Sequence, residues 1–362
     1  NPSSAYSFGN EVGEAVDHAR AQVAALINAE PREIIFTSCG TESNNAAINS
    51  ALQTQPGKRH VITTAVEHSA NIKYGQMLEK RGVEVTWIPV DRAGQLDVHE
   101  IHEAIREDTA MVSVMMANNE TGVVFPIEEI AAICRIKGVP FHTDAVQTPS
   151  KMELDVKALG VDYLSLSAHK LHAPKGIGCL YVRQGLPYQS YIVGGGQESG
   201  RRGGTENVAY MVAFGKAAEM ATASLGGEVE RIRALRDRME DGILEAIPGV
   251  TRNGAKEPRL ASTSNLSFAD CEAEAILLLL NREGICASSG SACTTGSMAP
   301  SHVLIAMGLS PEHAMGAVRF SLSKYTTDAE VDYLLEKLPG IIEKLRGASP
   351  KTEQPAAEAV NS

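Results

Sequence analysis

The sequence predicts an α/β fold, with a large domain built on a mostly parallel sheet and a smaller α+β domain after it. From about residue 11 to residue 185, apolar strand candidates alternate with amphipathic helical patterns, as in consecutive β–α–β units. After about residue 246 the strand candidates are fewer and are separated by short helical patterns. The chain has 362 residues, enough for one large or two medium domains.

In the first part of the chain, apolar runs bounded by turn residues predict strands. These are Glu33–Thr37, Val61–Thr64, Val83–Val90, Ala110–Ala117, Pro140–Thr143, Tyr163–Ser167 and Gly178–Val182. Helical patterns are expected near 11–28, 42–54, 69–81, 97–106 and 126–137. The polar motifs follow strand ends, where open α/β sheets bind ligands.

Residues 185–205 are rich in glycine and predict a loop, and a helix-rich segment continues to about residue 246. Beyond it, strands are expected at Ser264–Phe268, Gly284–Ser288 and Ala317–Leu322, and helices near 272–282, 301–308 and 328–346. We therefore expect a large domain over 1–225, a small domain over 226–346 and a polar, disordered tail over 347–362.

The charge of the chain argues against some classes of partner. Lys and Arg total 33 against 44 for Asp and Glu, which gives a formal net charge of −11 without any basic cluster. Nucleic acid and membrane are therefore not expected as partners. The longest aliphatic run, Ala275–Leu280, is far too short to cross a bilayer. The chain carries no signal-peptide pattern and opens on Asn1 rather than methionine, so we expect that its true N-terminus is missing.

Six cysteines are scattered along the chain without a CxxC pair or zinc-ligand spacing. In a chain of this length they indicate reduced thiols in the cytoplasm, and no metal site is expected. Cys134 and Cys179 are expected to be small core residues.

Asp144 and Lys170 are the two residues that first indicate which chemistry the protein performs. Asp144 ends the strand before Ala145, and Lys170 follows the strand Tyr163–Ser167, 26 residues later. A lysine amine can form a Schiff base with the aldehyde of pyridoxal phosphate, and an aspartate can keep the pyridine nitrogen protonated. By themselves the two residues could equally be a surface lysine and a strand-end carboxylate.

Further residues could bind the phosphate of such a cofactor. Gly40 and Thr41 open a helix directly after a strand, where unpaired backbone N–H groups and the helix dipole attract anions. Ser167 and His169 lie close to Lys170 in the sequence. Thr205 adds a hydroxyl from the glycine-rich loop that also contains Arg201 and Arg202. A plain capped helix start is the alternative interpretation of the first pair.

Three more strand ends carry candidate side chains. His68 could stack on a pyridine ring and move protons near neutral pH, or it could simply cap the following helix. Asn119 and Gln147 could hydrogen-bond the phenolic oxygen of the cofactor, and Asn119 could instead bind the substrate. Buried amides are also common loop anchors.

Cys293 lies in Ser288–Ser297, a run of small hydroxyl-bearing residues that predicts a mobile surface loop. A cysteine in such a loop is exposed and available as a nucleophile, although it could also be an incidental surface thiol. Arg319 interrupts an apolar strand. Its guanidinium could bind a substrate carboxylate or form a structural ion pair.

Together these segments resemble the cysteine desulfurases of the NifS/IscS type, within the class V aminotransferase group of fold-type I pyridoxal-phosphate enzymes. The motifs, in order, are TSCGTESNN, EHSAN, NNETG, HTDAVQ, SAHKLHAPKG, GGGQESGRRGGTEN and SSGSACTTGS. The resemblance covers essentially residues 1–346. The residues after Cys293 are similar to those of the nitrogenase-associated NifS branch.

The resemblance implies a transferase that converts L-cysteine to L-alanine and holds the sulfur as a persulfide on Cys293. It supplies that sulfur for iron–sulfur cluster assembly. Lys170 would be the cofactor-binding lysine and His68 an acid/base that stacks on the ring. The other cofactor-binding residues would be Asp144, Gln147, Gly40, Thr41, Ser167, His169 and Thr205, the last from the second subunit of a homodimer. Asn119 and Arg319 would bind the substrate carboxylate.

Alternatives stay open at this point. An aminotransferase of the same class has no need of a loop cysteine, whereas a selenocysteine lyase would share these residues. A non-catalytic subunit with the same fold is the third possibility. Proteins of this family usually have an Asp-Asn-Asn-Ala-Thr-like segment upstream of the position of Asn1, and if the chain begins at Asn1 we expect its activity to be impaired.

Overall fold

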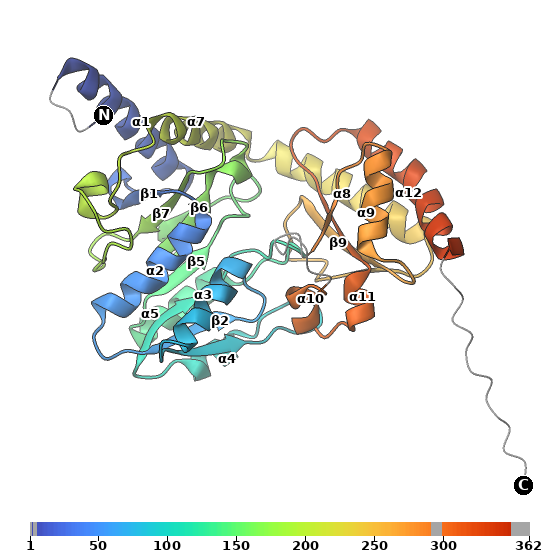
Figure 1. Ribbon diagram of the computed structural model, residues 1–362, viewed down its shortest axis with the longest axis horizontal. Coiled ribbons are helices and arrows are strands. Elements are labelled where there is room, and N and C mark those ends of the chain that lie inside the picture. The colour runs from blue at the N-terminus through green and yellow to red at the C-terminus, as the bar shows by residue number, and fades with distance from the viewer. Residues whose placement is uncertain (1, 3–5, 291–298, 349–362) are drawn as a thin grey trace, which may run out of the picture.

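A seven-stranded sheet forms the framework of the larger part of the molecule (Figure 1). This computed structural model describes residues 2, 6–290 and 299–348. The strand order is β1-β7-β6-β5-β4-β2-β3, and the pairs β2–β3, β2–β4, β4–β5 and β5–β6 are parallel. β7 is antiparallel to both of its neighbours, so the prediction of a mostly parallel sheet is confirmed. The strands are β1 (Ile34–Thr37), β2 (His60–Thr64), β3 (Glu84–Ile88), β4 (Thr109–Ser113), β5 (Phe141–Asp144), β6 (Tyr163–Ser167) and β7 (Gly178–Val182).

Helices cover both faces of this sheet because successive strand residues point to opposite sides. Ile35 packs in one apolar cluster with residues of α2 and α3, whereas Phe36 packs in another with residues of α1, α5 and α7. The helices of this part are α1 (Ser7–Leu26), α2 (Gly40–Thr54), α3 (Ser69–Glu79), α4 (Val98–Ala104), α5 (Ile127–Lys137), α6 (Val156–Leu159) and α7 (Val208–Ser224). Short 3₁₀ helices are η1 (Pro31–Glu33), η2 (Ala168–Leu171) and η3 (Gln197–Gly200).

Local sequence explains where these helices begin and end. α5 has Glu128 and Glu129 in its first turn and Lys137 in its last, which complements the helix dipole. Gly138 then ends it with a φ of 67°, a left-handed conformation that favours glycine. α6 begins at the side chain of Asp155, which accepts hydrogen bonds from two backbone N–H groups.

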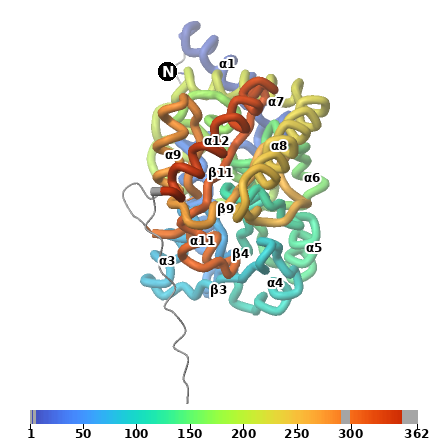
Figure 2. Tube along the Cα trace, turned by 90° about the vertical axis from the view of Figure 1, so that its right-hand side faces the viewer, coloured from blue at the N-terminus to red at the C-terminus, as the bar shows by residue number. Residues whose placement is uncertain are grey.

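A second, four-stranded antiparallel sheet of order β10-β11-β9-β8 forms the smaller part. α8, α9 and α12 pack against it around a separate apolar cluster, and α8 lies beside α12 (Figure 2). Its strands are β8 (Val250–Arg252), β9 (Thr263–Phe268), β10 (Ser288–Ser289) and β11 (Ala317–Ser321). Its helices are α8 (Gly227–Ala246), α9 (Ala273–Arg282), α10 (His302–Ala306), α11 (Pro311–Met315) and α12 (Asp328–Ala348).

The two parts are joined by apolar contacts as well as by the chain. Val303 and Leu304 of α10 are buried and belong to the core cluster of the larger sheet, not to that of the smaller one. The α10 segment follows residues 291–298 in the sequence, so one end of the stretch that contains Cys293 is packed on the larger part.

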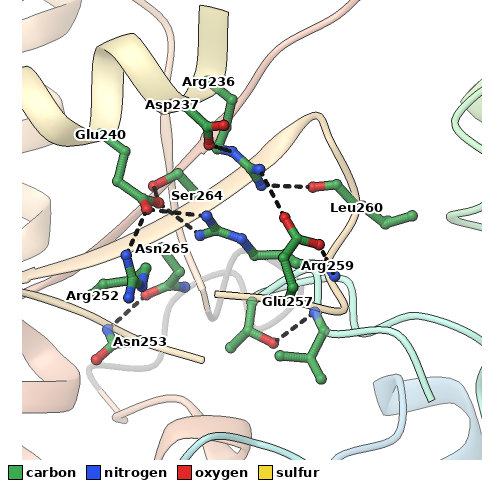
Figure 3. A network of polar contacts seen from close by, with 12 residues as sticks. Arg236, Asp237, Glu240, Arg252, Asn253, Glu257, Arg259, Leu260, Ser264 and Asn265 are labelled. Carbon is green, nitrogen blue, oxygen red and sulfur yellow. Dashed lines mark hydrogen bonds and ion pairs between the residues drawn. The ribbon is translucent and has the colours of Figure 1, made fainter. Parts of the chain in front are cut away.

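A buried charge network crosses the smaller part (Figure 3). Glu240 of α8 is 2% exposed and accepts two hydrogen bonds from Arg259, of 2.7 and 3.0 Å. The hydroxyl of Ser264 and the guanidinium of Arg252 also donate to it. Burial alone would raise the pKa of Glu240, but these hydrogen bonds lower it to about 2. The network therefore fixes α8 on β8 and β9.

Some predicted elements differ from the structure. The strand expected at Gly284–Ser288 is wrong except at its end: Gly284 turns the chain after α9 with a φ of 73°, and only Ser288–Ser289 pair with β11. β4 ends at Ser113 rather than at Ala117. Residues 114–117 stay buried and still donate to the carbonyls of His142 and Asp144, but the chain bends there before Asn118.

The short elements β8, α6 and α11 lay outside the predicted set. α12 continues to Ala348, so residues 347 and 348, which we expected in the tail, end a helix. Within the described ranges, no helix combines the length and the apolar content needed to span a bilayer. Cys134 and Cys179 are fully buried, as predicted.

Candidate active site

A cavity of about 220 Å³ lies at the carboxyl ends of β1, β5 and β6 and reaches β11 of the smaller part. A second cavity, of about 290 Å³, adjoins it and shares Asn119, Gln147, His169, Lys170 and Arg319. Among the predicted site residues that the structure describes, all except Thr205 line the first cavity. Its lining comprises Cys39, Gly40, Thr41, Asn44, His68, Met115, Asn119, Asp144, Val146, Gln147, Ser167, His169, Lys170, Gly290 and Arg319.

Asp144 is the last residue of β5 and is held by two hydrogen bonds. Its Oδ1 accepts from the backbone N–H of Val146 at 3.0 Å, and its Oδ2 accepts from Nδ2 of Asn44 at 2.6 Å. Asp144 is 6% exposed, so its contacts within the protein, and not solvent, fix the direction of both carboxylate oxygens. A carboxylate fixed in this way can accept a hydrogen bond from a protonated ring nitrogen of a ligand in the cavity.

Lys170 lies in η2, within the connection from β6 to β7 that spans residues 168–177. β6 and β7 are hydrogen-bonded neighbours, and Ser167 and Gly178 face each other in register where the connection starts and ends. Ser167 and His169 are joined by a hydrogen bond of 2.8 Å between Oγ and Nδ1. Burial, followed by the charges of Lys170 and Lys175, lowers the pKa of His169.

His68 caps a helix, as its sequence position suggested, and also lies at the cavity. Its Nδ1 accepts a hydrogen bond of 3.2 Å from the backbone N–H of Ala70 and so caps α3, while its ring lines the cavity. Burial lowers the pKa of His68; the nearby Asp144 acts in the opposite direction, and Lys170 lowers it further. The lowered pKa favours the neutral imidazole at pH 7, in which Nδ1 can act as an acceptor.

Arg319 of β11 brings the smaller part into the site through a contact with Asn119 of the larger part. Nη1 of Arg319 donates to the backbone oxygen of Asn119 at 2.8 Å. The side-chain Oδ1 of Asn119 is buried and has no hydrogen-bond partner among the described residues. A buried amide oxygen in this state favours a ligand that supplies a donor.

The start of α2 provides a cradle for an anion. Thr37 of β1 and Ser167 of β6 are both in register with Gly178 of β7, which separates the two strand ends. A Cβ on Gly178 would lie 2.7 Å from the carbonyl oxygen of Leu166, so only glycine fits there. A Cβ on Gly40 would lie 2.8 Å from Cγ2 of Val146, so glycine is needed for the close packing of the first turn of α2, whose N–H groups have no partner within the helix.

Sequence reasoning missed some residues of this site. Asn44 shares a motif with Thr41, but its hydrogen bond to Asp144 depends on the packing of α2 against the end of β5. Lys151 donates to Oε1 of Gln147 at 3.5 Å and lines the adjoining cavity. Burial, together with Lys170 and Arg319, lowers the pKa of Lys151 to about 8.

Two predicted site residues are not placed in the cavity. Cys293 falls in 291–298, outside the described residues. Thr205 is exposed in the loop after η3 and does not line the cavity of its own chain.

Comparison with known proteins gives the family. The aminotransferase class-V family matches residues 1–334. The chain belongs to this family. It is 57% identical to cysteine desulfurase 2 of Trichormus variabilis over 97% of the chain and 88% of that protein. It is 50% identical to the cysteine desulfurase NifS of Azotobacter vinelandii over 97% of the chain and 87% of that protein.

Solved structures also resemble the fold of this chain. A NifS-like protein superposes with a TM-score of 0.89 at 38% identity, covering 95% of the chain and 92% of that structure. A structure described as SspA in complex with cysteine gives a TM-score of 0.79 at 35% identity, covering 90% and 92% of the two chains. These similarities confirm the predicted fold-type I architecture and the predicted resemblance to cysteine desulfurases.

The class V aminotransferases and cysteine desulfurases are pyridoxal-phosphate enzymes, and the cavity fits that cofactor. The fixed oxygens of Asp144 can accept a hydrogen bond from a protonated ring nitrogen. The side-chain-free cradle at Gly40 and the adjacent Ser167 provide for a phosphate. Lys170 supplies the amine between them.

Proposed function

We propose that this cavity binds pyridoxal phosphate and that the protein uses it to convert L-cysteine to L-alanine. The observation that carries the proposal is the convergence of Lys170, the anchored carboxylate of Asp144 and the Gly40 cradle on one cavity. When bound, the cofactor supplies an electron sink conjugated to the substrate Cα.

The cavity residues would then bind different parts of the cofactor. Asp144 would hold a proton on the ring nitrogen, and Gln147 would hydrogen-bond the phenolic oxygen. Lys170 would hold the cofactor and, when displaced by the substrate, take the proton from Cα. Gly40, Thr41, Ser167 and His169 would bind the phosphate.

His68 and the two substrate-binding residues act on the amino acid. Arg319 would bind the substrate carboxylate with its guanidinium fork, and the side-chain N–H group of Asn119 would donate a further hydrogen bond to it. The neutral imidazole of His68 would stack on the ring and accept the proton of the substrate thiol.

In this proposal the sulfur of the substrate is transferred to Cys293. The thiolate of Cys293 would attack the sulfur of L-cysteine, so that an S–S bond forms while the Cβ–S bond breaks. The electron pair of the broken bond stays with carbon, which is protonated and departs as L-alanine. Cys293 is left as a persulfide, from which the sulfur passes to an acceptor protein.

Sulfide and alanine release from L-cysteine, measured with added pyridoxal phosphate and a thiol reductant, tests these roles. We expect equal amounts of the two products from the wild type and loss of both with Lys170→Ala and Cys293→Ala. Two matched controls should remain active: Lys344→Ala on the surface of α12, and Cys286→Ala, an exposed cysteine seven residues before Cys293.

The outcomes separate the rival activities. Amino-acid turnover without sulfide, or activity that does not depend on Cys293, would assign the site to another class V aminotransferase reaction. A much higher rate on selenocysteine than on cysteine would assign it to a selenocysteine lyase. A protein that does not bind the cofactor would be a non-catalytic subunit.

The assembly in which the protein works is also part of the proposal. We propose a homodimer in which the exposed Thr205 reaches the phosphate of the neighbouring subunit. Val193, in the same glycine-rich segment, is 81% exposed, and a second copy would cover it. A sedimentation measurement that finds only monomers at the assay concentration would contradict the dimer.

The sulfur would go to an iron–sulfur scaffold protein in the cytoplasm. The identity to a protein named NifS favours a scaffold of the nitrogenase type. In the described part the cysteines are unpaired, which supports a reducing compartment. We further propose that residues 1–225 form the cofactor-binding domain and residues 226–346 the small domain. Transfer of labelled sulfur to a purified scaffold, compared with a sulfur-carrier protein, would test the acceptor.

A further inference from the structure

Glu120 is a buried carboxyl group for which the proposed reaction has no role. It follows Asn119 directly, lies after the bend that ends β4, and is 3% exposed. Burial raises the pKa of Glu120 to about 7, although a hydrogen bond from Ser301 and the charge of Arg319 act in the opposite direction. A buried carboxyl group is costly, so a purely space-filling role would be better served by an apolar residue.

Its Oε2 atom lies where the two ends of the Cys293 segment meet. The hydroxyl of Ser301, three residues after residue 298, donates to Oε2 at 2.5 Å. Gly290, directly before residue 291, packs against the same oxygen so closely that a Cβ there would approach it to less than 3.0 Å. One carboxyl oxygen therefore contacts the residues on both sides of the segment.

The neighbouring contacts attach these same ends to the candidate active site. Ser288 and Ser289, before Gly290, pair in register with Arg319 and Val318 of β11. His302, after Ser301, is hydrogen-bonded through Nε2 to the backbone oxygen of Glu67, the residue before His68. Glu120 joins these two attachments, one on the smaller part and one on the larger part.

We propose that Glu120 is a positioning residue that holds the two ends of the Cys293 segment together beside the cavity. By fixing the ends, it restricts the region that the Cys293 thiol can occupy and keeps that region within reach of the substrate sulfur. The inference rests on the proposed role of Cys293 as sulfur acceptor.

The first test is persulfide formation on Cys293 in a single turnover of the cofactor-loaded dimer, quantified by mass spectrometry. Glu120→Ala should slow this step by about tenfold or more, because small misplacements of reacting groups have effects of that size. Cofactor content and the spectroscopic affinity for L-cysteine should remain those of the wild type. Glu120→Gln, which keeps the length and an oxygen acceptor for Ser301, should restore most of the rate.

A double-mutant cycle tests the contact with Gly290. Gly290→Ala should slow persulfide formation because its methyl group displaces the Glu120 carboxyl, whereas adding it to Glu120→Ala should cost little more. Gly340→Ala is the matched control, because a Cβ at Gly340 meets nothing within 4 Å. Independent, additive effects of Gly290→Ala and Glu120→Ala would overturn the proposed contact.

Two outcomes overturn the inference in distinguishable ways. Wild-type persulfide formation in Glu120→Ala, or an equal loss of cofactor and cysteine binding, would overturn the positioning role alone. Undiminished sulfide release from Cys293→Ala would overturn the proposed function, and the role of Glu120 with it.

Discussion

Nδ2 of Asn44 donates a hydrogen bond of 2.6 Å to Oδ2 of Asp144, across 100 residues of sequence. The bond links the first turns of α2 to the end of β5. It therefore couples the carboxylate of Asp144, which we propose faces the cofactor ring, to the helix whose start is the proposed phosphate cradle.

Replacing Asn44 by alanine should weaken cofactor binding. Asp144 would keep only the hydrogen bond from the N–H of Val146, and a hydrogen bond to a charged group contributes about 1.5–3 kcal/mol. We expect pyridoxal phosphate to bind about tenfold to 100-fold more weakly, measured by absorbance titration of the apoprotein. Asn253→Ala removes a buried asparagine from the smaller part and should leave this affinity unchanged. Equal affinities in Asn44→Ala and the wild type would contradict the prediction.

Gly40→Ala should also weaken cofactor binding, but for a steric reason. The added methyl group would lie 2.8 Å from Cγ2 of Val146 and 3.5 Å from Ser167, so the cradle must shift. We expect a loss of affinity of about tenfold from a shift of this kind. The double variant Gly40→Ala/Val146→Ala restores the space and should regain most of the affinity. If Val146→Ala gives no recovery, the clash is not the cause.

The pH dependence of turnover should reflect the lowered pKa of His68. Burial disfavours the charged imidazolium, so the midpoint of His68 protonation lies below the ordinary pKa of about 6.5. We expect kcat/KM for L-cysteine to show no loss from His68 until the pH is below that value. His68→Gln should lower kcat by about 100-fold or more and remove the acidic limb that His68 causes. An acidic limb at or above pH 6.5 that disappears in His68→Gln would contradict this.

The smaller part should lose stability in acid because of Glu240. Its pKa is lowered from 4.5 to about 2 in the folded protein, so its contribution is fully present above pH 4.5 and is lost as the pH falls towards 2. Glu240→Gln should cost about 3–5 kcal/mol at pH 7, since Arg259 is left buried without its partner. Urea unfolding at pH 7 and pH 3 measures both effects. Glu336→Gln, which removes an exposed carboxylate, is the control.

The strands β6 and β7 were predicted at their observed bounds because each is a short apolar run ended by turn residues. The cavity residues at strand ends could be predicted for the same reason, since carboxyl ends of parallel strands meet at one edge. Asn44 could not, because nothing local distinguishes its amide from that of Asn45. Which amide meets Asp144 depends on the rotation of α2 against the sheet.

The failures lie where pairing partners are distant and segments are short. Residues 284–288 have the composition of a strand, but Gly284 turns the chain after α9, and of the expected strand only Ser288 pairs with β11, together with the next residue Ser289. Glu120 was part of a recognised motif, yet its contacts with Gly290 and Ser301 join segments 170 or more residues away.

Lys170 belongs to a short connection between two adjacent antiparallel strands, not to a long crossover. A short connection whose ends are both hydrogen-bonded to the sheet cannot carry its side chain far away. In the proposed reaction, an amine released by the substrate would therefore remain at a very high effective concentration beside the substrate. Lys170 would then serve in two successive steps of that reaction, first as a tether and then as a base, without a diffusive search between them.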